Sequence, residues 1–247
     1  MRDASPEAWL AGVDGCTGGW VVAFVRPDRS EARVRIVPRF ADVLAAPERP
    51  MVVAVDMPIG LPDRVGIGGR AAENAVRPLL GARQSSVFSV PSRTAIYAAD
   101  YGDACRLAQA TSDPPRKVSK QLFNIMPKIR EVDEALRANP KAAEQTFEVH
   151  PELAFWRLNG GRALGEPKKV KSRPYEPGLA LRRGLLIAAG LSKDLVNTPP
   201  PKGAAADDLL DALACAAIAR RIRAGTAEPF PNPPPRDGFG LAMAIWA

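Results

Sequence analysis

The sequence contains little cysteine and almost no histidine: of 247 residues, three are cysteine and one is histidine. Cys16, Cys105 and Cys215 lie far apart and none forms a Cys-x-x-Cys pair, which argues against a zinc site. A catalytic thiol is also disfavoured, because His150 is the only histidine available to activate it. We expect Cys215 to be a buried packing residue, whereas Cys16, close to Asp14, is a candidate to line a site.

The sequence also lacks long apolar runs. No stretch approaches the roughly 20 apolar residues of a membrane-spanning helix, and no basic start followed by an apolar centre marks a secretory leader. We therefore expect a soluble, cytoplasmic protein with no membrane partner. Acidic side chains are fewer than basic ones, and the net charge is +7. This excess of positive charge favours anionic partners, of which nucleic acid is the most obvious. A basic soluble protein without such a partner fits the charge equally well.

The N-terminal part of the chain alternates apolar runs with turns. Three glycines within residues 15–19 predict a tight turn between two strands. The predicted elements are strands at 9–14, 20–26, 32–38 and 51–56, with a helix at 40–46. The first three strands form an antiparallel meander. The fourth is continuous and β-branched, as is typical of a strand covered by helices on both faces.

A mostly helical stretch follows, in which Pro127 predicts a kink or a break. The predicted elements are helices at 70–80, 94–109 and 118–138, a strand at 146–150, helices ending at 158 and at 178–190 and 205–224, and an extended, solvated, proline-rich tail. This order predicts a single α/β domain over residues 1–247, a mixed sheet flanked by helices. A helical insertion at about 62–144 separates its fourth and fifth strands.

Aspartates stand where apolar segments end or begin. Asp14 ends the first strand, Asp56 ends the fourth, and Asp208 and Asp211 lie one turn apart near the start of the last long helix. A carboxylate at the end of a buried strand is costly to desolvate unless a positive group joins it. Carboxylate oxygens bind Mg²⁺ or Mn²⁺, and paired ions of this kind support phosphodiester hydrolysis. We therefore expect these four residues to share a divalent-metal site.

Each aspartate also has a purely structural explanation. Asp207 or Asp208 is a good helix N-cap, Asp56 can cap the turn that follows it, and Asp14 can form an Asx turn. The three explanations are independent of one another. The combination of all three positions in one chain favours the shared site.

Several short motifs, in this order, make the chain similar to a known family. They are residues 12–20 (GVDGCTGGW), 56–62 (DMPIGLP), 83–88 (RQSSVF), 148–152 (EVHPE) and 208–214 (DLLDALA). With them the chain resembles the DUF429 family of predicted RNase H-like nucleases over about residues 10–246. The resemblance implies a ribonuclease H-like fold, whose acids lie on the first strand, a later strand and a late helix. Asp14, Asp56 and the pair Asp208 and Asp211 match those positions.

Two further candidates lie in the 148–152 motif. Glu148 and His150 have strand spacing, so their side chains project to the same face. Glu148 is a candidate additional metal ligand. His150 is a candidate catalytic residue that protonates a leaving group or hydrogen-bonds a water at the site. The alternative is a histidine satisfied by a nearby carboxylate or backbone carbonyl.

Basic and hydroxyl side chains form a set of candidate substrate-binding residues. Arginine and serine donors suit phosphate oxygens, and Phe88 among them is placed to stack on a base. The candidates are Arg83, Ser85, Ser86, Arg93, Lys120 and Lys128. The alternatives are a structured loop whose arginines pair with acids and, for the lysines, a solvated helix surface. The basic loop at 168–173 either clamps a phosphate backbone or is flexible.

The leading functional hypothesis is a metal-dependent nuclease that uses Mg²⁺ or Mn²⁺. A sugar-kinase or actin-type phosphotransferase shares the β-meander, but the sequence contains no second Asp-x-Gly loop and no second copy of the domain. A non-catalytic nucleic-acid-binding protein is the third possibility. The sequence has no heptad pattern, and it leaves open the oligomeric state and the choice between DNA, RNA and branched substrates.

Overall fold

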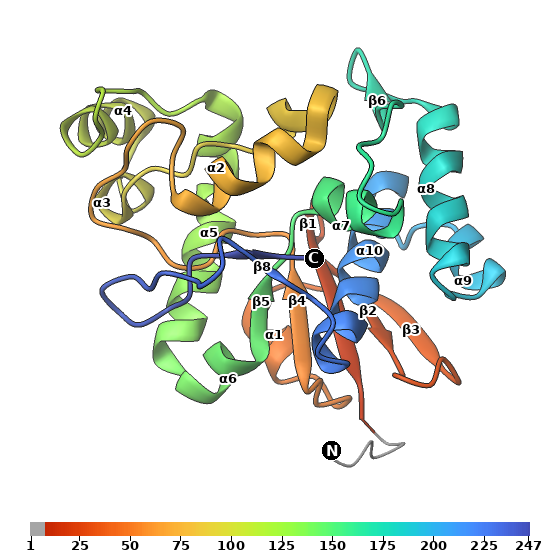
Figure 1. Ribbon diagram of the computed structural model, residues 1–247. Helices are drawn as coiled ribbons and strands as arrows, with labels where there is room; N and C mark the ends of the chain where they lie inside the picture. Colours follow the sequence, from red (N-terminus) through yellow and green to blue (C-terminus); the bar gives the residue numbers. More distant parts are fainter. Residues whose placement is uncertain (1–7) are drawn as a thin grey trace.

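A seven-stranded mixed sheet forms the centre of the computed structural model, which describes residues 8–247 (Figure 1). The strand order is β3-β2-β1-β4-β5-β9-β8. β1, β2 and β3 are antiparallel neighbours, whereas β1, β4, β5 and β9 run parallel. The bounds are β1 Leu10–Cys16, β2 Gly19–Val25, β3 Ala32–Val37, β4 Val52–Val55, β5 Thr146–Glu148, β8 Pro229–Phe230 and β9 Ile245–Trp246. The predicted mixed sheet flanked by helices is thus confirmed.

Helices cover both faces of the sheet because its central strands are apolar on both sides. Alternate residues of β1 point to opposite faces: Ala11 and Val13 pack with α1 (Phe40–Leu44) and α5 (Lys120–Ala138). Leu10 packs on the other face with α10 (Ala206–Arg223), α7 (Pro151–Leu158) and α8 (Glu176–Ala188). The other helices are α2 Ala71–Val76, the 3₁₀ helix η1 Arg77–Ser86, α3 Arg93–Ile96, α4 Tyr101–Ala110, α6 Pro140–Gln145 and α9 Lys193–Asn197.

The helical stretch between β4 and β5 differs in detail from the sequence prediction. The helix predicted at 70–80 is α2 continued by a 3₁₀ helix, and the one predicted at 94–109 is divided into α3 and α4. Asp100 caps α4 by accepting a hydrogen bond from Asp103 N, so a new helix starts there. A kink or a break was the prediction for Pro127, and the break is absent because α5 continues through that residue.

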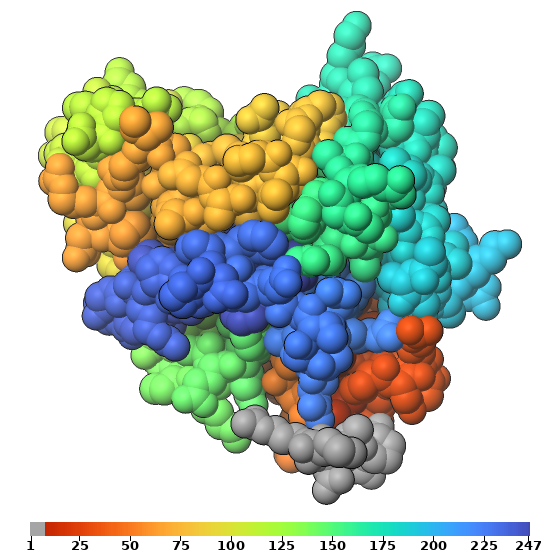
Figure 2. Space-filling model, viewed as in Figure 1, coloured from red at the N-terminus to blue at the C-terminus, as the bar shows by residue number. Residues whose placement is uncertain are grey.

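The prediction of an extended, solvated proline-rich tail holds for the extended backbone of its two ends, whereas full solvation of these ends is wrong. β8 and β9 pair with each other, and Ile245 of β9 pairs with Glu148 of β5, so the tail extends the sheet. In Figure 2 this C-terminal segment, in dark blue, lies across the face between α6 and the yellow helical segment. The 169–174 part of the basic loop is likewise a small hairpin, β6 Lys169–Val170 with β7 Arg173–Pro174.

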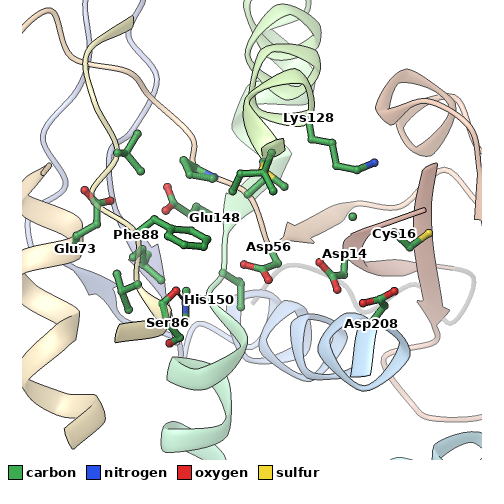
Figure 3. A pocket seen from close by; sticks show the side chains of 18 of the residues that line it. Asp14, Cys16, Asp56, Glu73, Ser86, Phe88, Lys128, Glu148, His150 and Asp208 are labelled. Carbon is green, nitrogen blue, oxygen red and sulfur yellow. Dashed lines mark hydrogen bonds between the residues drawn. The ribbon is translucent and has the colours of Figure 1, made fainter. Parts of the chain in front are cut away.

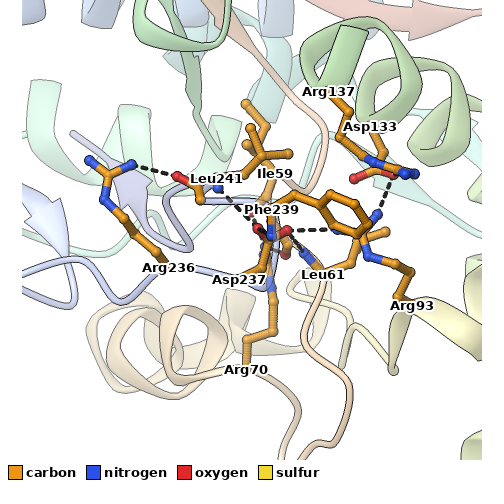
Figure 4. Close-up of polar contacts among 12 residues, drawn as sticks. Ile59, Leu61, Arg70, Arg93, Asp133, Arg137, Arg236, Asp237, Phe239 and Leu241 are labelled. Atoms are coloured by element: carbon orange, nitrogen blue, oxygen red, sulfur yellow. Dashed lines mark hydrogen bonds and ion pairs between the residues drawn. The ribbon is translucent and has the colours of Figure 1, made fainter. Parts of the chain in front are cut away.

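A polar network fastens the tail to the helical stretch (Figure 4). The Asp237 carboxylate accepts a hydrogen bond from Leu61 N at 2.9 Å and pairs with Arg93 at 2.7 Å. Arg93 also pairs with Asp133 of α5. Within residues 8–247 no helix is both long and apolar enough to cross a bilayer.

Candidate metal centre

Three aspartates converge at the edge of the sheet where β1 and β4 end. One carboxylate oxygen from each of Asp14, Asp56 and Asp211 lies within 4.8 Å of the other two. Figure 3 shows the Asp14 and Asp56 side chains next to each other above α10. The structure therefore brings together two strand aspartates, Asp14 and Asp56, and one helix aspartate, Asp211, as the sequence predicted.

Backbone geometry explains why these side chains meet. β1 and β4 are parallel neighbours, and Asp56 N donates to the Val13 carbonyl at 2.9 Å, so Asp14 and Asp56 leave adjacent strands at the same edge. Asp211 arrives on α10, which packs directly against β1 at Gly12. A Cβ built on Gly12 would lie 2.1 Å from the Ala212 carbonyl oxygen and from Ala216 N. Glycine therefore allows the close contact that brings the helix acid to the strand acids.

The carboxyl groups resist ionisation at this site. Burial, followed by the charges of Asp56 and Asp211, raises the pKa of Asp14 well above its ordinary value. Burial and the charge of Asp211 raise the pKa of Asp56 to about 8. Burial raises the pKa of Asp211 to about 6, and Lys168 opposes this rise. Like charges at this separation need a bound cation before all three ionise together.

Asp208 stands beside the three clustered carboxylates rather than among them. Its carboxylate accepts a hydrogen bond from Ala205 N at 2.8 Å and so closes the first turn of α10. It also lines the same cavity as Asp14 and Asp56. Asp207, the alternative N-cap, is buried and pairs with Lys169 at 2.6 Å. Asp208 thus has both the structural role and a place at the site.

A cavity of about 550 Å³ opens over the cluster. Its polar side carries Asp14, Asp56 and Asp208, and Figure 3 shows Phe88 and His150 across from them. Apolar side chains complete the opposite wall: Met57, Pro58, Val87, Val90 and Ile125. Cys16 lines the cavity as predicted, and Cys215 is fully buried in the core, also as predicted. A carboxylate floor with an apolar wall is suited to a ligand that carries both a phosphate and a flat apolar group.

Glu148 lies outside the group of carboxylates that could hold an ion. It pairs with the buried Arg70 at 2.6 Å and accepts a hydrogen bond from Ile59 N at 2.8 Å. Burial raises its pKa to about 7, against the opposing effect of Arg70. Glu148 therefore holds the segment that follows Asp56, and it lines the same cavity without joining the three clustered aspartates.

His150 lines the cavity as an uncharged imidazole. Burial lowers its pKa to about 4, so the ring is neutral at pH 7. Nε2 lies 3.3 Å from the Ser86 carbonyl oxygen, while Nδ1 is buried and has no hydrogen-bond partner. In the tautomer with the proton on Nε2, that N–H donates a hydrogen bond to the Ser86 carbonyl oxygen, and Nδ1 keeps a free lone pair. In this state the ring can accept a hydrogen bond at Nδ1.

The predicted substrate-binding residues divide into two groups. Ser86 and Lys128 line the cavity, and Lys128 Nζ donates to the Gly19 carbonyl at 2.6 Å. The others lie outside the lining among residues 8–247: Arg83, Ser85, Arg93 and Lys120. Arg93 is committed to Asp133 and Asp237, as the alternative of paired arginines had anticipated. Lys120 covers the Tyr101 ring, with Nζ 3.5 Å from the ring centroid.

Two important contacts were not predicted from the sequence. Lys168 of the basic loop forms an ion pair with Asp211, and Arg70 forms the buried pair with Glu148. Lys168 and Asp211 are separated by 43 residues and Arg70 and Glu148 by 78. No local spacing connects such residues, so only the fold reveals them.

The residues present fit a divalent ion. Asp14, Asp56 and Asp211 offer only carboxylate oxygens, the ligands preferred by Mg²⁺ and Mn²⁺. Asp211 Oδ1 is buried and has no hydrogen-bond partner, although its other oxygen is paired with Lys168. A buried, unpartnered carboxylate oxygen is costly unless a cation satisfies it.

Comparison with known proteins identifies a family and no characterised relative. The family model described as "Protein of unknown function (DUF429)" matches residues 12–236, which include Asp14, Asp56, Asp208 and Asp211. No significant match to a curated protein or to a solved structure was found.

Proposed function

Because the chain belongs to the DUF429 family, whose function is unknown, its chemistry has to be inferred from the site, and we propose a metal-dependent nuclease. It would hydrolyse phosphodiester bonds of nucleic acid with Mg²⁺ or Mn²⁺ held by Asp14, Asp56 and Asp211. The observation that carries this proposal is the convergence of these three carboxylates within 4.8 Å of one another, two of which, Asp14 and Asp56, line a cavity.

The sheet supports an RNase H-like interpretation of the fold. Asp14 lies near the end of a first strand that has an antiparallel partner and a parallel one, and Asp56 follows that parallel partner. Asp211 lies on a late helix that crosses the same strand. This distribution of acids over the first strand, a later strand and a late helix is the one that the resemblance implies.

Different side chains of the chain have different roles in such a reaction. Bound divalent ions supply Lewis-acid stabilisation of charge and activation of a water. Asp208 lies beside the three clustered carboxylates and can orient a water in the cavity, while neutral His150 offers Nδ1 as a hydrogen-bond acceptor. The Lys128 ammonium at the cavity wall is placed to meet a phosphate oxygen. Phe88 offers the adjacent base a ring to stack on.

The test is hydrolysis of labelled RNA, DNA and branched junctions by purified protein with Mg²⁺ or Mn²⁺. We expect Asp14→Asn to reduce the rate by at least about 100-fold, because one ligand of the ion is lost. Asp63→Asn is the matched control, since Asp63 is exposed and outside the cavity lining. Absence of cleavage by the wild type, or full cleavage by Asp14→Asn, would reject the proposal.

The same samples separate the other functions. Binding of nucleic acid that persists in chelator, without turnover, would identify a non-catalytic binding protein. A thermal shift on addition of ATP and Mg²⁺ would favour the phosphotransferase. A nuclease of the proposed type should show no response to ATP beyond that to Mg²⁺ alone.

A further inference from the structure

The β6–β7 hairpin brings two consecutive lysines onto the first turns of α10. Lys168 Nζ pairs with Asp211 Oδ2, and Lys169 Nζ pairs with Asp207 Oδ2 at 2.6 Å. The first of these contacts places an ammonium on a carboxylate of the candidate metal centre. The second lies one turn away from it on the same helix.

Lys168 acts on the whole cluster and not only on its direct partner. Its charge opposes the rise in pKa of Asp14, Asp56 and Asp211 alike. Burial by itself would lower the pKa of Lys168, yet Asp211 and Asp14 hold it above its ordinary value. The ammonium therefore occupies the position where the field of the three carboxylates is concentrated.

The backbone that carries Lys168 is anchored, whereas its side chain can leave. The Lys168 carbonyl accepts from Tyr175 N at 3.0 Å, and Arg182 holds the preceding Glu166 carbonyl at 3.0 Å. The Lys168 side chain is still 29% exposed, so it has a path into solvent. A long, flexible lysine side chain on a fixed hairpin can exchange partners without unfolding the loop.

We propose that Lys168 serves as an internal cation which occupies the carboxylate cluster in the metal-free protein and is displaced when a divalent ion binds. An ammonium and a divalent ion repel one another at this distance, so their occupation of the cluster is antagonistic. The displaced ammonium then lies at the mouth of the site, where it can contact a substrate phosphate. This inference rests on the proposed metal site and adds the residue that sets its metal affinity.

The experiment measures Mn²⁺ binding by the full-length chain at pH 8, by calorimetry and by electron paramagnetic resonance of free Mn²⁺. Lys168→Met removes the charge and keeps a side chain of similar length. Lys168→Arg keeps the charge at the same place. Lys171→Met is the matched control, since Lys171 lies on the same hairpin, is exposed and has no ion pair among residues 8–247.

We expect Lys168→Met to bind Mn²⁺ at least about 10-fold more tightly than the wild type, because the competing cation is gone. Lys171→Met should stay within about two-fold of the wild type, and Lys168→Arg should bind no more tightly than the wild type. If Lys168→Met folds only when Mn²⁺ is present, the ion has replaced the ammonium and the inference is supported. Failure to fold even with Mn²⁺ would overturn it.

The remaining outcomes distinguish this inference from the proposed function. If the wild type binds Mn²⁺ and Lys168→Met binds it equally or more weakly, the metal site stands and the competing role of Lys168 is rejected. If neither protein binds Mn²⁺, the metal site and the inference fall together. Binding by Lys168→Met alone would support both.

Discussion

The guanidinium of Arg70 donates to the Glu148 carboxylate at 2.6 Å and, from Nη1, to the Ile59 carbonyl at 2.7 Å. Both Arg70 and Glu148 are almost fully buried. Glu148 in turn accepts from Ile59 N. The Arg70–Glu148 ion pair thus holds both the N–H and the carbonyl of Ile59, three residues after Asp56. Because Glu148 belongs to β5, the pair ties the position of Asp56 to that strand.

Arg70→Met should therefore destabilise the fold strongly. It leaves Glu148 and Glu73 buried without their cation, and removal of one partner of a buried ion pair costs about 3–5 kcal/mol. Urea unfolding monitored by circular dichroism measures the loss. Arg64→Met is the control, because Arg64 is exposed and should change stability by less than about 0.5 kcal/mol. Equal stability of the two variants would show that the pair contributes nothing.

The cluster also predicts an unusual dependence of stability on pH in metal-free buffer. The pKa of Asp56 is 3.8 ordinarily and about 8 in the folded chain, so the folded state holds its proton longer. Such a raised pKa contributes stability that is complete at low pH and is lost as the pH rises through about 8. We therefore expect the free energy of unfolding to fall as the pH rises from about 4 to about 8 and to level off above that, by at most about 1.4 kcal/mol per pH unit for each proton.

Comparison with a variant separates the contribution of Asp56 from those of its neighbours. His150, with a pKa of 6.5 ordinarily and about 4 in the folded chain, and Glu148, with a pKa of about 7, also titrate below pH 8, but they are present in both proteins. Thermal unfolding of wild type and Asp56→Asn in chelator provides the comparison, and the variant should show the flatter curve. A parallel decline in both proteins would mean that Asp56 ionises normally in the folded chain.

Asp14→Asn should be more stable than the wild type without metal and less stable with it. Its carboxyl is buried beside two others, so at about pH 8 the folded chain must either ionise it among like charges or keep a proton that the unfolded chain has lost. The amide avoids both costs, and we expect it to raise the free energy of unfolding by at least about 1 kcal/mol. With saturating Mn²⁺ the wild type gains binding energy that the variant loses. Urea titrations in chelator and in Mn²⁺ should thus rank the two proteins in opposite order. The same rank in both buffers contradicts a metal role for Asp14.

Local sequence predicted the parts of the site that depend on strand ends. Asp14 and Asp56 could be placed because each follows an apolar run, and parallel strands bring such positions to one edge of a sheet, although β1 continues past Asp14 to Cys16. Asp211 could be placed one turn after Asp208, but the spacing alone did not show which of them faces the strands. The Ala205 N–Asp208 hydrogen bond decides that in favour of Asp211.

Long-range contacts account for what could not be predicted. β9 joins the sheet through Ile245, whose two-residue strand is too short to give a period. Pro127 lies inside an intact helix whose buried residues include Met126 and Ile129, so tertiary packing outweighs the local cost of proline. Lys168 carries no motif at all and meets Asp211 only because the hairpin folds over α10.

The close contact of β1 with α10 gives a prediction about site assembly. In Gly12→Ala the new Cβ would meet backbone atoms of Ala212 and Ala216 at 2.1 Å, so the helix must move away from the strand. We expect a loss of at least about 2 kcal/mol in unfolding free energy, and weaker Mn²⁺ binding because Asp211 moves with the helix.

Gly184→Ala is the matched control for this substitution. Gly184 lies exposed in α8, and a Cβ there meets nothing within 4 Å. Alanine at such a helical position should stabilise the protein by about 0.5–1 kcal/mol and leave Mn²⁺ affinity unchanged. Urea unfolding and Mn²⁺ titration of both variants therefore distinguish a general effect of alanine from the effect of moving α10 away from β1. Unchanged Mn²⁺ affinity in a folded Gly12→Ala protein would show that Asp211 does not depend on this contact to reach Asp14.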